Sequence, residues 1–304
     1  MAVPGILMSR AGFAAMRLAQ RLSALSAGDR IPKFEDLATE LGCGKGTVQA
    51  GFDLLGEAGG LRLRSRGRLG TFVDEIDHTV LWRLAGQRSV SVAMPLPYSR
   101  RYEGLATGLH ASFADAGIPL TLMFMRGSVA RLRALAEGRA DFVVMSALAA
   151  GSSDDLEIVH NFGPGSYVAA HALILADGCT ADTPGLRVGV DPASEDQVRL
   201  VDRAFGPLPG AQRVEVSYNQ LESAFRDGRI DATVWNVDEI RAHISAPVSI
   251  EPLALARDAA NTQAVIVRAA TEVPVPVGVR AALTAATVLD RAHDVVAGRA
   301  TPTY

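Results

Sequence analysis

The stretch ELGCGKGTVQAGFDLL, residues 40–55, decides the fold of the first quarter of the chain, together with LRLRSRGRLGTFV, residues 61–73. In the first of these stretches, a glycine-rich turn is followed by apolar residues at helical spacing. Val48, Phe52 and Leu55 fall on one face of the helix that this spacing predicts. A tight turn that leads directly into a short amphipathic helix is half of a helix-turn-helix.

Two further helical patterns precede this stretch. Residues 9–25 place Leu18 and Leu22 on one face, and Gly28 ends the pattern. Residues 34–41 form a short second helical pattern with apolar residues directed inward. Two short helices around a tight glycine turn predict a helix-turn-helix that extends from the second pattern to the third.

Residues 61–73 predict a β-hairpin. Leucines alternate with arginines on the outgoing strand, Arg66-Gly67 supplies the turn, and LGTFV returns. Residues 1–73 carry a net charge of +4, whereas the rest of the chain carries −7, and the total is −3. The sequence therefore predicts that only the small N-terminal part meets a polyanion.

A helix-turn-helix with a basic hairpin behind it indicates DNA binding. The exposed N-terminal end of the third helix fits a major groove, and arginine is the preferred cation along the backbone and in a narrow minor groove. Glycine at the tip of the hairpin permits close approach of its backbone to DNA. The predicted DNA-contacting residues are Lys45, Thr47, Gln49, Arg64, Arg66, Gly67 and Arg68.

The same residues carry a family resemblance. ELGCGKGTVQAGFDLL with RSRGRLGTFV resembles the GntR-type winged helix, with its small-residue turn, its Thr-Val helix start and its G-T-F-V wing end. More narrowly, RIPKFEDLATELGCGKGTVQ with SRGRLGTFV is similar to the YhfZ family of regulators. The resemblance implies DNA contacts at the seven positions named above. It departs from many GntR proteins at Gly44-Lys45 and at Gln49, and Gln49 suits adenine better than guanine.

The remainder of the chain alternates strands and amphipathic helices, which predicts a mostly parallel α/β domain. Two segments have the same form, an amphipathic helix, a glycine, a basic residue, an apolar residue, an aspartate and an apolar strand: residues 132–146 and 221–236. Two such lobes resemble the type II periplasmic-binding-protein fold. We therefore expect a winged helix-turn-helix domain, a linker, and a bilobal domain with its second lobe at about 178–245, with bounds at residues 1–75, 76–88 and 89–304.

In this fold a ligand lies between the lobes, near the carboxyl ends of the strands. Serines at helix starts with arginines nearby suit a carboxylate or phosphate, although such serines are also ordinary helix caps. Trp235 fits the protein core as well as a lid over the ligand. The predicted ligand-binding residues follow the expected strands, and they are Tyr98, Ser99, Arg101, Arg126, Ser128, Ser146, Asp191, Ser194, Trp235 and Asn236.

These features predict a ligand-responsive transcription regulator in the cytoplasm, with a double-stranded DNA operator and a small, anionic effector as partners. We expect a homodimer, no membrane association and no cofactor. We also expect no metal site, because the histidines are scattered and Cys43 and Cys179 lie far apart. We expect no enzymatic activity. Two alternatives stay open: a cytoplasmic small-molecule-binding module, and a lyase or transferase on the binding-protein fold.

Overall fold

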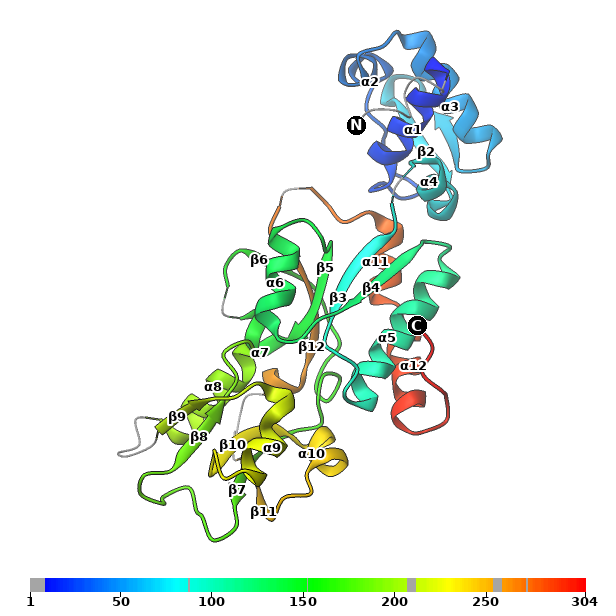
Figure 1. Ribbon diagram of the computed structural model, residues 1–304. Helices are drawn as coiled ribbons and strands as arrows, with labels where there is room; N and C mark the ends of the chain where they lie inside the picture. The colour runs from blue at the N-terminus through cyan, green and yellow to red at the C-terminus, as the bar shows by residue number, and fades with distance from the viewer. Residues whose placement is uncertain (1–8, 87, 152, 207–211, 254–258, 272) are drawn as a thin grey trace. The chain divides into compact units, whose positions relative to one another are not determined.

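The computed structural model describes residues 9–86, 88–151, 153–206, 212–253, 259–271 and 273–304 (Figure 1). The chain divides into two compact units. The first consists of residues 1–90 with two later segments, 112–120 and 272–285, and the second consists of residues 91–111, 121–271 and 286–304.

Three helices build the predicted helix-turn-helix: α1 (Arg10–Leu22), α2 (Phe34–Leu41) and α3 (Lys45–Glu57). Ser9 caps α1, because its hydroxyl accepts a hydrogen bond of 3.0 Å from the amide of Gly12. The first helix ends three residues before its predicted end at residue 25. The glycine-rich turn between α2 and α3 lies where the sequence places it.

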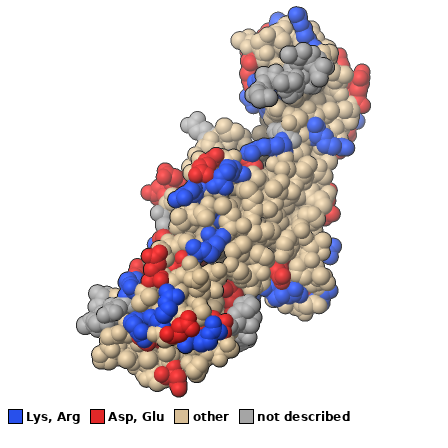
Figure 2. Space-filling view, viewed as in Figure 1, with Lys and Arg blue, Asp and Glu red and all other residues tan. Residues whose placement is uncertain are grey.

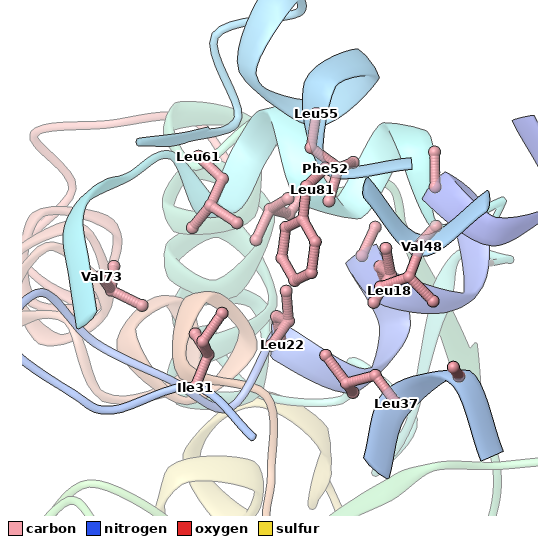
Figure 3. Packing of buried hydrophobic residues seen from close by; sticks show 14 residues of the cluster. Leu18, Leu22, Ile31, Leu37, Val48, Phe52, Leu55, Leu61, Val73 and Leu81 are labelled. Atoms are coloured by element: carbon pink, nitrogen blue, oxygen red, sulfur yellow. The ribbon is translucent and has the colours of Figure 1, made fainter. Parts of the chain in front are cut away.

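A single hydrophobic cluster holds the three helices together (Figure 3). The ring of Phe52 from α3 lies at its centre, stacked on Phe34 with a centroid distance of 4.9 Å. Leu18, Leu22 and Leu55 are fully buried around it. The apolar spacing read from the sequence therefore corresponds to one core, with α1 packed closely on α3.

The hairpin consists of β1 (Leu61–Ser65) and β2 (Thr71–Ile76), which pair antiparallel around the 3₁₀ turn η2 (Gly67–Leu69). Leu61 and Val73 on its inner face are buried in the helix-turn-helix core. The outer face carries arginines. The predicted winged architecture is thus present in the structure.

The segment expected as a linker, residues 76–88, contains a helix, α4 (His78–Leu84). Asp77 caps it by accepting from the amide of Val80 at 3.0 Å. Leu81 is fully buried in the same cluster as the winged helix (Figure 3). The Thr79 hydroxyl donates to the carbonyl of Ala116 at 2.6 Å. The sequence left open which surface this segment covers, and the structure packs it within the first unit.

The first lobe of the α/β part is a five-stranded sheet in the order β4-β3-β5-β12-β6. The strand β3 is parallel to β5, and β12 is antiparallel to both β5 and β6. Its strands are β3 (Val90–Met94), β4 (Leu120–Phe124), β5 (Phe142–Ser146), β6 (Leu156–Asn161) and β12 (Ala264–Ala269), and its helices are α5 (Arg100–Asp115), α6 (Ser128–Ala136) and α7 (Ala147–Ala150).

The second lobe repeats this plan with the strand order β11-β7-β10-β8-β9 (Figure 1). Here β10 is parallel to β8, and β7 is antiparallel to β10. Its strands are β7 (His171–Ala176), β8 (Arg187–Val190), β9 (Gln212–Glu215), β10 (Ala232–Asn236) and β11 (Val248–Pro252); its helices are α8 (Glu195–Phe205), η3 (Tyr218–Gln220), α9 (Leu221–Arg226) and α10 (Val237–His243). The turn η4 (Ala259–Thr262) precedes β12.

The second lobe is larger than the predicted 178–245, since β7 and β11 also belong to its sheet. Both strands lie outside the range that the sequence predicted for this lobe. The backbone amide and carbonyl groups of both strands are paired antiparallel within one sheet. Chain connectivity alone does not tell a crossover from an edge strand.

The internal repeat has one structural cause in both lobes. Asp141 accepts hydrogen bonds from the amide and the hydroxyl of Ser91, at 2.8 and 2.6 Å. In the second lobe, Asp231 accepts from the amide of Arg187 at 2.9 Å and from its guanidinium. Each aspartate therefore fastens the start of one core strand to the start of its neighbour.

The C-terminal helical pattern forms two helices, α11 (Val277–Thr284) and α12 (Ala286–Val296), because Ala285 takes an extended conformation. The second of them packs on α5 of the first lobe. The contact is very close: a Cβ on Gly108 would lie 2.1 Å from the carbonyl oxygen of Val288. Only glycine fits at this crossing.

Candidate functional site

The exposed start of α3 carries the side chains predicted to read DNA. Lys45 and Gln49 are exposed, and Thr47 is half-buried. Lys45 forms an ion pair with Glu35 of α2, with 2.7 Å between Nζ and Oε1, and its hydrogen bond lowers the pKa of that carboxyl. The amide of Gln49 donates to Asp53 at 2.9 Å. Exposed pairs of this kind contribute little to stability, so both side chains can exchange them for contacts to DNA.

The wing arginines fall into two classes. Arg62 and Arg64, near the base, both form ion pairs with Asp74 of β2, at 2.9 and 2.6 Å, and Arg62 also pairs with Glu75. Both acids lie on the returning strand, just beyond the stretch 61–73 from which the hairpin was predicted.

The arginines at the tip of the wing differ from those at its base. Arg66 lies over the ring of Phe72, with its guanidinium carbon 4.7 Å from the centroid. Neither Arg66 nor Arg68 pairs with a carboxylate among the residues that the structure describes. Gly67 adopts a φ of 57° between them. The tip therefore presents two cations that no acid of the described chain neutralises.

Arg30 is a further wing cation that the sequence interpretation missed. It forms an isolated antiparallel bridge with Phe72 of β2. A Cβ on Gly70 would lie 2.7 Å from its Nε, which shows how closely the guanidinium packs on the wing. The basic residue of the turn GDRIP was the available signal, but only the fold brings it beside the hairpin.

Between the two lobes of the α/β part lies a cavity with a volume of about 70 Å³. Six of the ten predicted ligand-binding residues line it: Tyr98, Arg126, Ser128, Asp191, Ser194 and Asn236. They come from four different strand ends or helix starts, which confirms that the fold brings these segments together. Ligand contact at these residues stays a prediction.

Asp191 is the most heavily coordinated of the predicted residues. Its buried carboxylate accepts from Nη1 of Arg126 at 2.5 Å, from the amide of Tyr218 at 2.6 Å and from the amide of Ala193 at 2.9 Å. Arg126 belongs to the first lobe and Asp191 to the second. This ion pair therefore links the two lobes across one side of the cavity.

Two predicted residues at the cavity also have structural roles. The hydroxyl of Ser128 accepts from the amide of Glu195 at 3.2 Å, which is a second contact between the lobes. Asn236 caps α10 by accepting from the amide of Glu239 at 3.0 Å. The cap alternative was stated for the serines, and neither Ser128 nor Ser194 makes a side-chain cap on its own helix.

The other four predicted residues do not line this cavity. Ser99 is buried at the start of α5, and Ser146 caps α7 through the amide of Ala149 at 3.0 Å. Trp235 points into the apolar core of the second lobe. Arg101 is held by Asp238 at 3.2 Å and by the carbonyl of Gly165. These residues do follow the expected strands, but their side chains are not part of the cavity lining.

Other lining residues escaped the sequence interpretation. They are mostly aromatic or charged side chains from helices and crossovers: Tyr102, Arg131, Tyr167, His171, Asp196, Gln197, Tyr218 and Glu239. Burial raises the pKa of Tyr167 to about 12 and lowers that of His171 to about 4, so both are neutral at pH 7. A signal existed for Arg131, which shares a helix face with the buried residues Ala134 and Leu135.

The described residues contain no group of three or more His, Cys, Asp or Glu side chains placed to hold a metal ion. None of the described helices is long and apolar enough to cross a membrane. On the face shown in Figure 2, basic and acidic side chains are intermingled over the α/β part.

Comparison with known proteins agrees with this architecture. Residues 26–73 match the model of a helix-turn-helix domain, and residues 77–304 match that of the YhfZ C-terminal domain. The protein YhfZ of Escherichia coli K12 is 33% identical over 303 residues, which cover 98% of each chain.

Solved structures extend the comparison. The crystal structure of YhfZ from Shigella flexneri has a TM-score of 0.60 at 33% identity, covering 74% of this chain and 97% of that one. The VFT2 domain of Bordetella pertussis BvgS has a TM-score of 0.52 and 14% identity, covering 71% and 95%. An ancestral arginine-binding protein has a TM-score of 0.51 at 14% sequence identity, and the match covers 70% of this chain and 98% of that one. The last two share the fold of the α/β part, that of type II periplasmic binding proteins. By sequence over its whole length and by the fold of its larger part, the chain belongs to the YhfZ family.

Proposed function

We propose that this protein is a DNA-binding transcription regulator, and not an enzyme, whose activity responds to a small ligand held between the lobes. The observation that carries the proposal is the exposed tip of the wing, where Arg66 and Arg68 have no carboxylate partner in the described chain, next to a complete helix-turn-helix. A chain that combines a helix-turn-helix domain with a binding-protein-like domain has the architecture of a ligand-responsive regulator.

The proposed DNA contacts divide into two groups. At the start of α3, Lys45, Thr47 and Gln49 enter the major groove, where Gln49 can pair with an adenine edge. The wing contributes contacts to phosphates or to the minor groove, through Arg64, Arg66, Gly67, Arg68 and, in addition, Arg30. The first group governs sequence preference, and the second governs affinity and its dependence on salt.

The proposed effector is a small molecule that carries an anionic group, since two arginines, Arg126 and Arg131, line the cavity. Because Arg126 pairs with Asp191 across the cavity, a ligand that strengthens or replaces this pair shifts the equilibrium between open and closed lobes. In a cytoplasmic homodimer on a near-palindromic operator, such a shift changes the spacing of two winged helices.

The test is binding of the purified protein to DNA from upstream of its own gene, beside random DNA of equal length, at two salt concentrations. The proposal predicts specific binding that weakens with salt. A Gln49→Ala variant should change the preference among operator sequences, whereas a matched Glu57→Ala variant, exposed at the other end of the same helix, should retain it. Binding to neither DNA would refute the regulator and leave a small-molecule-binding module.

A further inference from the structure

Two polar atoms of the cavity have no hydrogen-bond partner. They are Nε of Arg131 and Oδ1 of Asp196, and each is unpaired among the residues that the structure describes. Both side chains line the cavity and are more than nine-tenths buried, with 3% and 8% of their surface exposed. A buried polar atom without a hydrogen-bond partner is costly, so an unpaired donor and an unpaired acceptor in one cavity indicate a ligand that pairs with both.

The remaining groups of the two residues are occupied and fix their orientation. The guanidinium of Arg131 donates to the carbonyl of Met125 at 3.1 Å and to the hydroxyl of Tyr167 at 3.3 Å. Ser146 and Arg131 both lower the pKa of the Asp196 carboxyl, against the effect of its burial. The guanidinium of Arg131 is therefore held in place, and Nε of Arg131 and Oδ1 of Asp196 stay without a partner among the described residues.

The other acids of the cavity are already satisfied. Asp191 has three partners, and Glu239 accepts from Nδ2 of Asn236 at 2.8 Å and from Nε1 of Trp235 at 3.1 Å. A purely anionic ligand would satisfy Arg131 and leave Asp196 unpaired. A purely cationic ligand would have the opposite defect.

We infer that the cavity binds a small zwitterion of the amino-acid class, with its carboxylate toward Arg131 and its ammonium group toward Asp196. This inference rests on the proposed function, because it names the effector of the same site. Burial raises the pKa of Asp196 above its ordinary value, although Ser146 and Arg131 act in the opposite direction, and a bound ammonium group would shift this carboxyl toward its charged form.

The size and walls of the cavity agree with such a ligand. A volume of about 70 Å³ holds roughly five ordered waters, and hence a molecule of few heavy atoms in its enclosed part. Aromatic rings of Tyr102, Tyr167 and Tyr218 form part of the lining. Such rings tolerate both a short aliphatic side chain and a nearby ammonium group.

The experiment measures binding of common α-amino acids, in both L and D forms, to the full chain by calorimetry and thermal shift. Each amino acid is compared with its N-acetyl derivative, which lacks the ammonium group, and its methyl ester, which lacks the carboxylate. The inference predicts that at least one amino acid binds and that both of its derivatives bind roughly ten- to a hundredfold more weakly.

Asp196→Asn is the informative variant, since it keeps the size of the side chain and a partner for Ser146. It should weaken binding of the amino acid by a similar factor and leave binding of its N-acetyl derivative unchanged. Asp202→Asn, on the same helix and exposed, is the matched control. Arg131→Lys should weaken binding of the methyl ester less than binding of the amino acid, because the ester has no carboxylate for Arg131 to bind.

Three outcomes would overturn the inference: no amino acid binds, the N-acetyl derivative binds as tightly as its parent, or both aspartate variants behave alike. The operator-binding assay is run in parallel without any of these compounds. Amino-acid binding without operator binding would refute the regulator while upholding the inference. Operator binding together with a preference for simple carboxylates over amino acids would uphold the regulator and refute the zwitterion inference.

Discussion

Replacement of Arg66 by alanine should reduce the salt dependence of DNA binding more than replacement of Arg62. Arg66 at the tip of the wing lies over Phe72 and pairs with no carboxylate of the described chain, whereas Arg62 is held by Asp74 and Glu75. A cation already paired with protein acids displaces fewer counterions from DNA than an unpaired one. The two exposed arginines are thus matched in chemistry and differ in their partners.

The magnitude follows from counterion release. Each phosphate contact contributes about 0.9 to the slope of log K against log salt, so the loss of one contact lowers the slope by about that amount. Between 50 and 200 mM salt, one contact accounts for about a 3.5-fold change in affinity, and loss of both Arg66 and Arg68 accounts for about a twelvefold change. For Arg62→Ala, we expect the slope to change by less than about 0.45, which is half the contribution of one phosphate contact.

The assay is fluorescence anisotropy of a labelled operator over a potassium chloride series, with thermal unfolding of each variant as a check on folding. Loss of the contact between Arg66 and Phe72 should cost only about 0.5–1 kcal/mol of stability. Equal slope changes for Arg62→Ala and Arg66→Ala would refute the reasoning, because ion pairing within the wing would then have no effect on DNA contact. An unchanged slope in both would refute the wing as a DNA-binding element.

Three predictions concern stability. Gly108→Ala should destabilise the protein by about 1–3 kcal/mol in urea unfolding, since the added Cβ meets the backbone of α12. The control Gly56→Ala, whose Cβ makes only an ordinary contact at 3.5 Å, should be neutral or stabilising. Equal effects of the two substitutions on stability would contradict the close crossing of α5 and α12. The pKa of His171 is lowered from 6.5 to about 4, so the unfolded chain binds more protons and stability should fall as pH drops from 6.5 to 4. His171→Gln should reduce this pH-dependent fall in the free energy of unfolding by on the order of 2 kcal/mol, as measured by unfolding at both pH values. An unchanged dependence of stability on pH would argue against a neutral His171 in the folded protein. Asp231→Asn should cost about 1–2 kcal/mol because it removes the ion pair with Arg187, and retention of wild-type stability would show that this aspartate does not fasten the second lobe.

The sequence by itself determined the winged helix and the α/β class. These features depend on local interactions: apolar spacing for α1 to α3, glycine turns, and alternation in the wing. The repeated pattern around Asp141 and Asp231 also identified two related lobes, because in each lobe the aspartate directly precedes an apolar core strand. Periodicity and turn chemistry do not depend on distant parts of the chain.

The tertiary structure alone decided which side chains meet. Leu81 looked like part of a linker, but it joins the helix-turn-helix core. Arg101 and Ser146 follow the expected strands, yet other partners hold them outside the cavity. Arg131 and Asp196 lie within helices, where charged residues usually face water, and their burial depends on packing between segments far apart in sequence. A binding site is set by such long-range contacts, and local spacing carries no information about them.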